Sequence, residues 1–259
     1  MGFEADWLAL RAPADQRARD PGLLADAEAL IASRSKALVV DLGCGAGASV
    51  MAISAPGANW RLVDNDAALI ARAEAAAARR GTSAERRVLD LAAPGDGLAE
   101  AVSGADLVAS SAFLDLVSAA WIDRLVAALP DRAGLYVALS YSGEMRWAPE
   151  HPQDEPVRAA FNRHQSGDKG FGPALGPAAT GYLAETLEQA GRAPRLAQSD
   201  WRLSGERDGA LIRELTTGIA GAAREMGIDV EGWLEARRGA REGLVSHLDL
   251  YAPPLATPA

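Results

Sequence analysis

The sequence contains a single cysteine, Cys44, and this scarcity limits the chemistry open to the protein. One cysteine can form neither an internal disulfide nor a cysteine metal cluster. Only three histidines are present, and no third ligand lies near His151 and His164 at a spacing typical of a metal site. We therefore expect no metal, and we expect a reducing compartment, the cytoplasm.

Long apolar runs and an excess of basic residues are also missing. No stretch approaches the ~20 apolar residues of a membrane-spanning helix, and the first residues lack the basic region and cleavage site of a secretory signal. The formal net charge is −9 and the arginines are scattered, so the surface should repel phosphate backbones. We therefore expect neither a membrane nor a nucleic acid as partner.

Short apolar runs alternate with alanine-rich amphipathic stretches between Lys36 and Leu139. This alternation is typical of strand-helix units that feed a parallel sheet covered on both faces. With 259 residues, 49 % of them hydrophobic, the chain favours one α/β domain over residues 1–259. Strands are expected at Ala37–Leu42, Asn59–Asp64, Arg86–Leu89, Asp106–Ser110 and Gly134–Tyr141. Helices are expected near Ala46–Ser54, Ala67–Arg80, Gly97–Ser103 and Ser118–Leu129.

Both ends of the chain depart from this regular core at residues 36–141. Residues 1–35 predict two helices, separated by the region of Pro13 and Pro21, that form a cap. Residues 142–177 are rich in Gly, Pro, His and charge, which predicts an irregular loop that acts as a substrate lid. Residues 178–251 should complete the sheet, with a helix at 178–190, a strand at 195–203, helices at 208–226 and 230–241, and a last strand at 244–251.

A glycine-rich turn is the strongest functional signal. A buried strand runs directly into DLGCGAG, with Gly43, Gly45 and Gly47 at alternate positions and Cys44 as a small residue of the turn. Glycine lets the backbone approach a ligand closely and adopt positive φ. Gly43, Gly45 and Ala48 also satisfy the dinucleotide pattern G-x-G-x-x-A. The turn alone therefore does not distinguish a site for a dinucleotide from a site for another nucleoside cofactor.

Carboxylates near the strand ends distinguish a dinucleotide from another nucleoside cofactor better than the turn does. Asp64, followed by Asn65, ends the second expected strand, where a carboxylate can accept from both ribose hydroxyls of an adenosine. Asp90 ends the third, where it can accept from the adenine amine while the Leu91 N–H meets a ring nitrogen. Asp41 lies just before the glycine turn and complements a sulfonium cation above it. Asp90 and Asp41 therefore favour S-adenosylmethionine.

In these motifs the sequence resembles the class I, Rossmann-like S-adenosylmethionine-dependent methyltransferases. The resemblance spans about residues 36–139, and it rests on DLGCGAG, Asp64, Asp90-Leu91 and the segment DLVASS at 106–111. It implies an α/β, doubly wound and mostly parallel seven-stranded sheet. The antiparallel last strand would lie between the two strands before it in chain order.

The resemblance also implies roles at the methionine end of the cofactor. The glycine turn would face the methionine part, and Ser110 or Ser111 would lie near the sulfonium or the methionine carboxylate. That carboxylate needs a cation, which Arg11 or Arg17 of the N-terminal segment can supply.

Candidate catalytic and substrate residues follow the core strands. Methyl transfer mainly requires an aligned nucleophile and the exclusion of water, so a general base is optional. If the acceptor loses a proton, His164, His151, Asp115 or Tyr141 can remove it, and we rank His164 first, with Asp115 as the second catalytic candidate. Tyr141, Trp147, His151 and His164 are expected to bind the substrate. Each also has an ordinary interpretation, such as a solvated loop for His164 or a loop cap for Asp115.

The sequence thus predicts a methyltransferase that uses S-adenosylmethionine to methylate an oxygen or nitrogen of a small molecule. The acidic surface and the expected lid favour a small-molecule acceptor. Two alternatives stay open. One is an NAD(P)-dependent oxidoreductase, although no Tyr-x-x-x-Lys or other hydride-transfer constellation is evident, and the other is a non-catalytic protein that binds adenosylmethionine. The acceptor and the oligomeric state, including a homodimer, also stay open.

Overall fold

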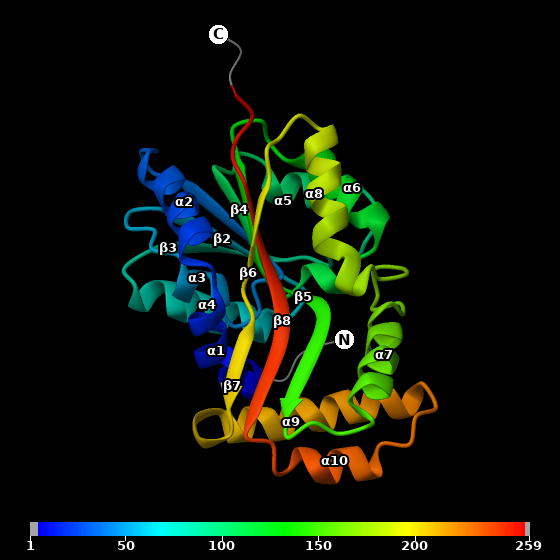
Figure 1. Cartoon of the computed structure of the whole chain (residues 1–259). Helices are drawn as coiled ribbons and strands as arrows, with labels where there is room; N and C mark the ends of the chain where they lie inside the picture. The colour runs from blue at the N-terminus through cyan, green and yellow to red at the C-terminus, as the bar shows by residue number, and fades with distance from the viewer. Residues whose placement is uncertain (1–4, 257–259) are drawn as a thin grey trace.

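The computed structural model describes residues 5–256, in which one eight-stranded sheet carries helices on both faces (Figure 1). The ends of the predicted cap and domain, residues 1–4 and 257–259, lie outside the described residues. The strands are β1 (Leu38–Leu42), β2 (Asn59–Asp64), β3 (Ser83–Val88), β4 (Leu107–Ser111), β5 (Gly134–Ala148), β6 (Arg195–Gln198), β7 (Trp201–Ser204) and β8 (Glu242–Ala252). The helices are α1 (Ala5–Ala18), α2 (Pro21–Ala32), α3 (Ala48–Ala52), α4 (Ala67–Arg79), α5 (Gly97–Val102), α6 (Ala119–Ala128), α7 (Asp154–Gln165), α8 (Ala179–Gln189), α9 (Gly205–Glu225) and α10 (Glu231–Arg237).

The strand order is β3-β2-β1-β4-β5-β8-β6, and β7 also pairs with β8. β1 to β5 are parallel, whereas β8 runs antiparallel to β5, β6 and β7 (Figure 1). This confirms the doubly wound sheet with an inserted antiparallel last strand. The order reverses between β1 and β4, and the carboxyl ends of strands at such a switch point are where open α/β sheets bind ligands.

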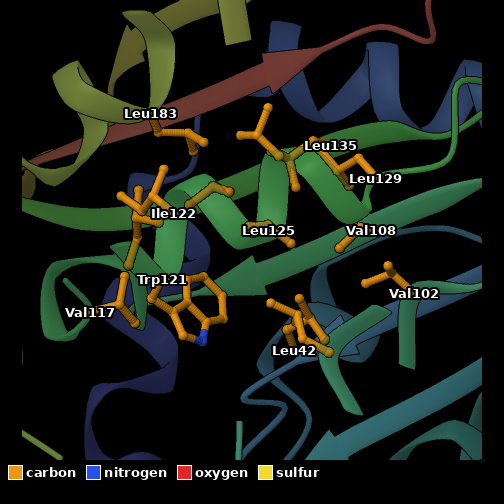
Figure 2. Packing of buried hydrophobic residues seen from close by; sticks show 14 of the residues in the cluster. Leu42, Val102, Val108, Val117, Trp121, Ile122, Leu125, Leu129, Leu135 and Leu183 are labelled. Carbon is orange, nitrogen blue, oxygen red and sulfur yellow. The ribbon is translucent and has the colours of Figure 1, made fainter. Parts of the chain in front are cut away.

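Two apolar clusters cover the two faces of the sheet. On one face, Trp121, Ile122 and Leu125 of α6 pack with Leu42 and Val108 of the sheet (Figure 2). The other face is covered by α2, α3 and the alanine-rich α4. Full burial of each large apolar side chain contributes about 1.5–3 kcal/mol, so these layers hold the strand ends in place.

The region of Pro13 and Pro21 was predicted to separate the two N-terminal helices. Pro13 itself lies inside α1. The guanidinium of Arg11 pairs with Asp15 across the proline, with 2.9 Å between Nε and Oδ2. This contact supports the helix where Pro13 lacks an N–H to donate. The helices separate within the predicted region, at Asp20 directly ahead of Pro21. The carboxylate of Asp20 caps α2 by accepting from the Leu23 N–H at 2.8 Å.

The prediction of an irregular segment at residues 142–177 is wrong for most of its length. β5 continues through Ala148 because its last residues pair with β8. α7 forms because Val157 and Ala160 provide a buried face behind an acidic first turn, a pattern that the many polar residues had hidden. Within the segment, residues 166–175 remain a loop. Its role as a lid stays a prediction.

Two boundaries at the sheet edges also differ from the prediction. β3 begins at Ser83, ahead of the expected Arg86, because its exposed edge position needs no apolar alternation. The single strand predicted at 195–203 is divided into β6 and β7, which both pair with β8. The sheet therefore has eight strands where seven were expected.

The buried carboxylate of Asp249 on β8 joins the N-terminal helices to the sheet. Its Oδ2 accepts from the Asp20 N–H at 2.9 Å, and its Oδ1 accepts from the Leu139 N–H at 2.8 Å. Leu139 has a φ of 58° at a register shift in β5, a conformation that non-glycine residues rarely adopt. One side chain thus stabilises both the start of α2 and an irregular point of the central sheet.

We predict that Asp249→Asn lowers the free energy of unfolding by about 1–3 kcal/mol, because an amide presents an N–H where one of the two backbone donors needs an acceptor. Urea denaturation measures the loss. The same substitution at Asp131, which is exposed, should change the free energy by less than about 0.5 kcal/mol. Equal effects of the two substitutions would contradict the joining role of Asp249.

Candidate functional site

A cavity of about 480 Å³ lies at the carboxyl ends of β1 to β4. Its walls are α1, the glycine turn after β1, the residues that follow β2, β3 and β4, and residues 169–171 of the loop after α7. Its volume is within the range of small-molecule sites, about 300–1,000 Å³. The predicted cofactor residues that line it are Gly43, Cys44, Gly45, Gly47, Asp64, Asn65, Asp90 and Leu91.

The three glycines of the turn are required by its geometry. Gly43, Gly45 and Gly47 have φ values of 65°, 49° and 95°. A Cβ at Gly43 would lie 2.7 Å from Cδ2 of Phe113, and one at Gly47 would lie 3.0 Å from Cα of Ala73. The turn therefore fits between the residues after β4 and helix α4 only without side chains.

Cys44 is a buried residue of the turn, and its backbone N–H donates to the Val63 carbonyl at 3.0 Å. Burial raises the pKa of its thiol far above the usual range, with the nearby carboxylates Asp41 and Asp64 adding to the shift. A thiolate nucleophile is thus disfavoured, and Cys44 serves as a small residue that closes the turn.

Asp64 holds the glycine turn against the end of β2. Its Oδ2 accepts from the Gly45 N–H at 2.9 Å, and its Oδ1 accepts from the Asp66 N–H at 3.0 Å. A carboxylate has about four acceptor sites, so two remain for hydroxyl groups of a ligand. Asp66 caps α4 by accepting from the N–H groups of Ala68 and Leu69.

Asp90 and Leu91 form the neighbouring part of the wall. Oδ1 of Asp90 accepts from the Ala92 N–H at 2.9 Å, and the Leu91 carbonyl accepts from Nε1 of Trp121 at 2.8 Å. β2 and β3 are adjacent strands, which lie about 4.8 Å apart. Asp64 and Asp90 therefore face one cavity at a separation that a single nucleoside can span.

Asp41 lies beneath the turn and does not line the cavity. Its Oδ1 accepts from the Ser49 hydroxyl at 2.8 Å, while its Oδ2 has no partner within the described residues. Burial raises the pKa of Asp41 to about 7, against the opposing effects of the Ser49 hydrogen bond and of the Arg19 charge. A positive charge above the turn would favour its ionised form.

Arg19, a residue that the sequence analysis missed, is a buried cation in the cavity wall. Its Nη2 donates to the Ser111 hydroxyl at 2.8 Å. Its Nε and Nη1 have no hydrogen-bond partner within residues 5–256. Buried N–H groups of a charged side chain are costly without an acceptor, so the Arg19 side chain indicates a site for an anion. The available signal was its position just before Asp20 and Pro21, the capped start of a helix.

The alternatives left open for the methionine end are distinguished by position. Ser111 lines the cavity, whereas Ser110 donates its hydroxyl to the Leu42 carbonyl at 2.9 Å. Arg11 lines the cavity, but the two hydrogen bonds of its side chain go to Asp15. Arg17 lies outside the cavity and pairs with Asp208 at 2.7 Å.

Among the described residues, the predicted catalytic and substrate residues do not line this cavity. Asp115 is buried in the turn after β4, and burial raises its pKa to about 6. The hydroxyl of Tyr141 donates to Oδ1 of Asn162 at 2.8 Å. Trp147 packs edge-on against Trp233 in a separate apolar cluster. The predicted roles of these residues therefore gain no support from their placement.

The two histidines of residues 142–177 have structural partners. Nδ1 of His151 accepts from the Gln153 N–H at 3.2 Å, just ahead of α7. His164 lies on α7 between Glu225 and Lys169, with its ring nitrogens 3.1 Å and 3.2 Å from Oε2 and Nζ. Of these five residues, Lys169 alone lines the cavity.

No group of three or more His, Cys, Asp or Glu residues between 5 and 256 is arranged to hold a metal ion. Over the same residues, no helix combines the length and the apolar character needed to cross a membrane.

Comparison with known proteins identifies the fold. No protein-family model matches the sequence, and no curated protein matches it. The YcgJ protein from Bacillus subtilis is 14 % identical with a TM-score of 0.53, over 92 % of this chain and 100 % of that one. A candidate methyltransferase from Bacillus halodurans is 13 % identical with a TM-score of 0.51, over 90 % of this chain and 99 % of that one. The chain has the class I methyltransferase fold that the motifs implied.

We predict that Gly47→Ala destabilises the protein more than Gly57→Ala. Both glycines have positive φ, so each alanine adds about 1–2 kcal/mol of backbone strain. A Cβ at Gly47 also meets the backbone of Ala73, whereas one at Gly57 meets nothing within 4 Å. Urea denaturation should show an extra loss of about 1 kcal/mol or more at Gly47. Equal losses would mean that the turn does not need close contact with α4.

Proposed function

We propose that this protein is an S-adenosylmethionine-dependent methyltransferase that acts on an oxygen or nitrogen of a small molecule. One observation carries the proposal. A single cavity brings together the glycine turn, the strand-end carboxylates Asp64 and Asp90, and the buried guanidinium of Arg19 with two free nitrogens. These groups complement a ligand with a nucleoside at one end and a carboxylate at the other.

Each part of the cofactor has a matching group. Asp64 would accept from the ribose hydroxyls with its remaining acceptor sites, and Asp90 with Leu91 would bind the adenine edge. Arg19 would bind the methionine carboxylate, because a charge-assisted pair satisfies its free Nε and Nη1. The Ser111 hydroxyl holds this guanidinium in place.

The charges at the turn favour a sulfonium over the pyrophosphate of a dinucleotide. Asp41 and Asp64 lie under and beside the glycines, and the Gly45 N–H already donates to Asp64. A pyrophosphate would face the Asp64 carboxylate, with the Asp41 carboxyl group beneath the turn, and would find one fewer free N–H. The helix after the turn, α3, has only five residues, so it offers a weak dipole to a phosphate.

The chain's own contribution to the reaction would be alignment and exclusion of water. When bound, the cofactor supplies a methyl group activated by sulfonium. Leu8, Phe113, Leu116 and Phe171 give the cavity apolar walls, and a dry wall strengthens the interactions that hold the reacting groups in line. No histidine of residues 5–256 lines the cavity, which agrees with a reaction that depends on alignment more than on a general base.

Calorimetry with S-adenosylmethionine, S-adenosylhomocysteine and NAD tests the proposal directly. We expect saturable binding of the first two and none of NAD. Release of S-adenosylhomocysteine during incubation with a small-molecule extract would separate an enzyme from a non-catalytic binding protein. Saturable NAD binding without a response to S-adenosylmethionine would reverse the assignment.

We predict that Arg19→Gln weakens binding of S-adenosylhomocysteine by about 10- to 100-fold, the equivalent of one charged hydrogen-bonding partner. Arg17→Gln is the matched control, because Arg17 lies outside the cavity, and it should leave the affinity unchanged. Asp64→Ala should also weaken binding of S-adenosylhomocysteine. Circular dichroism checks that this variant is folded. Equal affinities of the Arg19 and Arg17 variants would remove Arg19 from the site.

We predict a pH dependence that separates the two forms of the cofactor. Because the pKa of Asp41 is raised to about 7, its ionised fraction grows between pH 6 and pH 8. An ionised carboxylate attracts a sulfonium, so the affinity for S-adenosylmethionine should rise over this window relative to that for S-adenosylhomocysteine, whose sulfur is neutral. Asp41→Asn should flatten the ratio of the two affinities. A ratio that is already flat in the unaltered protein would contradict the role of Asp41.

A further inference from the structure

Lys169 is an unusual residue in this chain because lysine is almost absent. Of the 26 lysine and arginine residues, only Lys36 and Lys169 are lysines. Lys36 is exposed just ahead of β1, whereas Lys169 is half-buried and lines the cavity. Lysine is a compact point charge on a flexible stem, unlike the planar guanidinium that the chain uses almost everywhere else. This difference singles out Lys169 as the cation to explain.

One side chain contacts the ammonium group of Lys169, and a second side chain holds the first. Its Nζ lies 3.2 Å from Nδ1 of His164, and Nε2 of His164 lies 3.1 Å from Oε2 of Glu225 at the end of α9. An ammonium can only donate, so Nδ1 must accept and the ring proton must be on Nε2, from which it is donated to Glu225. The ammonium is thus oriented from behind, and two of its three N–H donors remain available.

No carboxylate within residues 5–256 forms a salt bridge with Lys169. The acidic residues in the cavity wall have other partners. Asp15 accepts from Arg11 and Trp201, Asp64 from two backbone N–H groups, and Asp66 and Asp90 from the turns that follow them. Arg19 is the better-buried partner for the methionine carboxylate, so the charge of Lys169 is left for a different anion.

The loop that carries Lys169 also provides an apolar wall. Phe171 lies edge-on against Phe113, with 5.3 Å between ring centroids, and both rings line the cavity. Phe113 also packs over Gly43 of the turn. A cation beside aromatic rings suits a compact molecule that has an apolar body and one anionic group.

We propose that Lys169 binds an anionic oxygen group, a carboxylate or a phosphate, of the methyl acceptor, and that His164 and Glu225 are positioning residues for its ammonium. This inference rests on the proposed function and names the class of its substrate: small apolar or aromatic acids. It also gives His164 a role through Lys169 in place of the predicted role as a base.

The test uses the protein saturated with S-adenosylhomocysteine, after that binding has been measured. Calorimetric titrations compare matched probes: benzoate with benzamide, phenylacetate with phenylacetamide, and phenyl phosphate with phenol. We expect at least one anion to bind about 10-fold or more tightly than its neutral partner. A larger preference for phenyl phosphate would assign a phosphate, and a larger preference for the acids would assign a carboxylate.

Lys169→Met should abolish this preference, whereas Lys36→Met, the same substitution at the other lysine, should leave it unchanged. His164→Asn keeps an acceptor oxygen near the place of Nδ1 and should retain most of the preference. His164→Phe keeps a ring of similar size without an acceptor and should lose most of it. A purely structural role of His164 would affect both variants alike, through their melting temperatures and not through the ratio of affinities.

Three results would overturn the inference while the proposed function stands: anions that bind no better than their neutral partners, no binding of any probe, or a preference that survives Lys169→Met. A fourth is a loss of S-adenosylhomocysteine affinity in Lys169→Met as large as that in Arg19→Gln, which would assign Lys169 to the cofactor. Failure of S-adenosylhomocysteine to bind the unaltered protein would instead overturn the proposed function, and this inference with it.

Discussion

The buried carboxylate of Asp249 is the interaction on which the candidate site depends. It accepts from the backbone N–H of Asp20, at the junction of α1 and α2, and from that of Leu139 in the central sheet. Arg19 precedes Asp20, so the same bond fixes the guanidinium that lines the cavity. α1 then covers the glycine turn, and Leu8 lies close to Gly45. Without this connection, the cavity would lose both the guanidinium of Arg19 and one of its walls.

Charge is balanced locally in the cavity, although the whole chain carries a net charge of −9. Asp41 and Asp64 make the turn electronegative, and the guanidinium of Arg19 lies close enough to lower the pKa of Asp41 in opposition to its burial. A zwitterionic sulfonium ligand would complement both signs at once, with its cation above the carboxylates and its carboxylate on Arg19. Lys169 provides a second, separate positive charge at the loop side of the same cavity.

The parts of the site that the sequence predicted are those in which neighbouring residues carry the whole signal. The glycine turn, Asp64 and Asp90 each follow directly from a strand, and parallel strands place their carboxyl ends at one edge of the sheet. The predictions failed where composition was an incomplete guide. Pro13 was expected to separate two helices, yet it lies inside α1, where Arg11 and Asp15 pair across it.

The sequence by itself determined the fold class and the turn with its two strand-end carboxylates, because periodicity, glycine and helix caps act over a few residues. The inserted antiparallel last strand followed only from the family resemblance. Tertiary structure alone decided which charged side chains reach the cavity. Arg19 meets Ser111 across 92 positions, and His164 meets Glu225 across 61. Burial and pairing at such separations depend on the packing of whole elements, so one arginine among many becomes a buried cation only when the chain is folded.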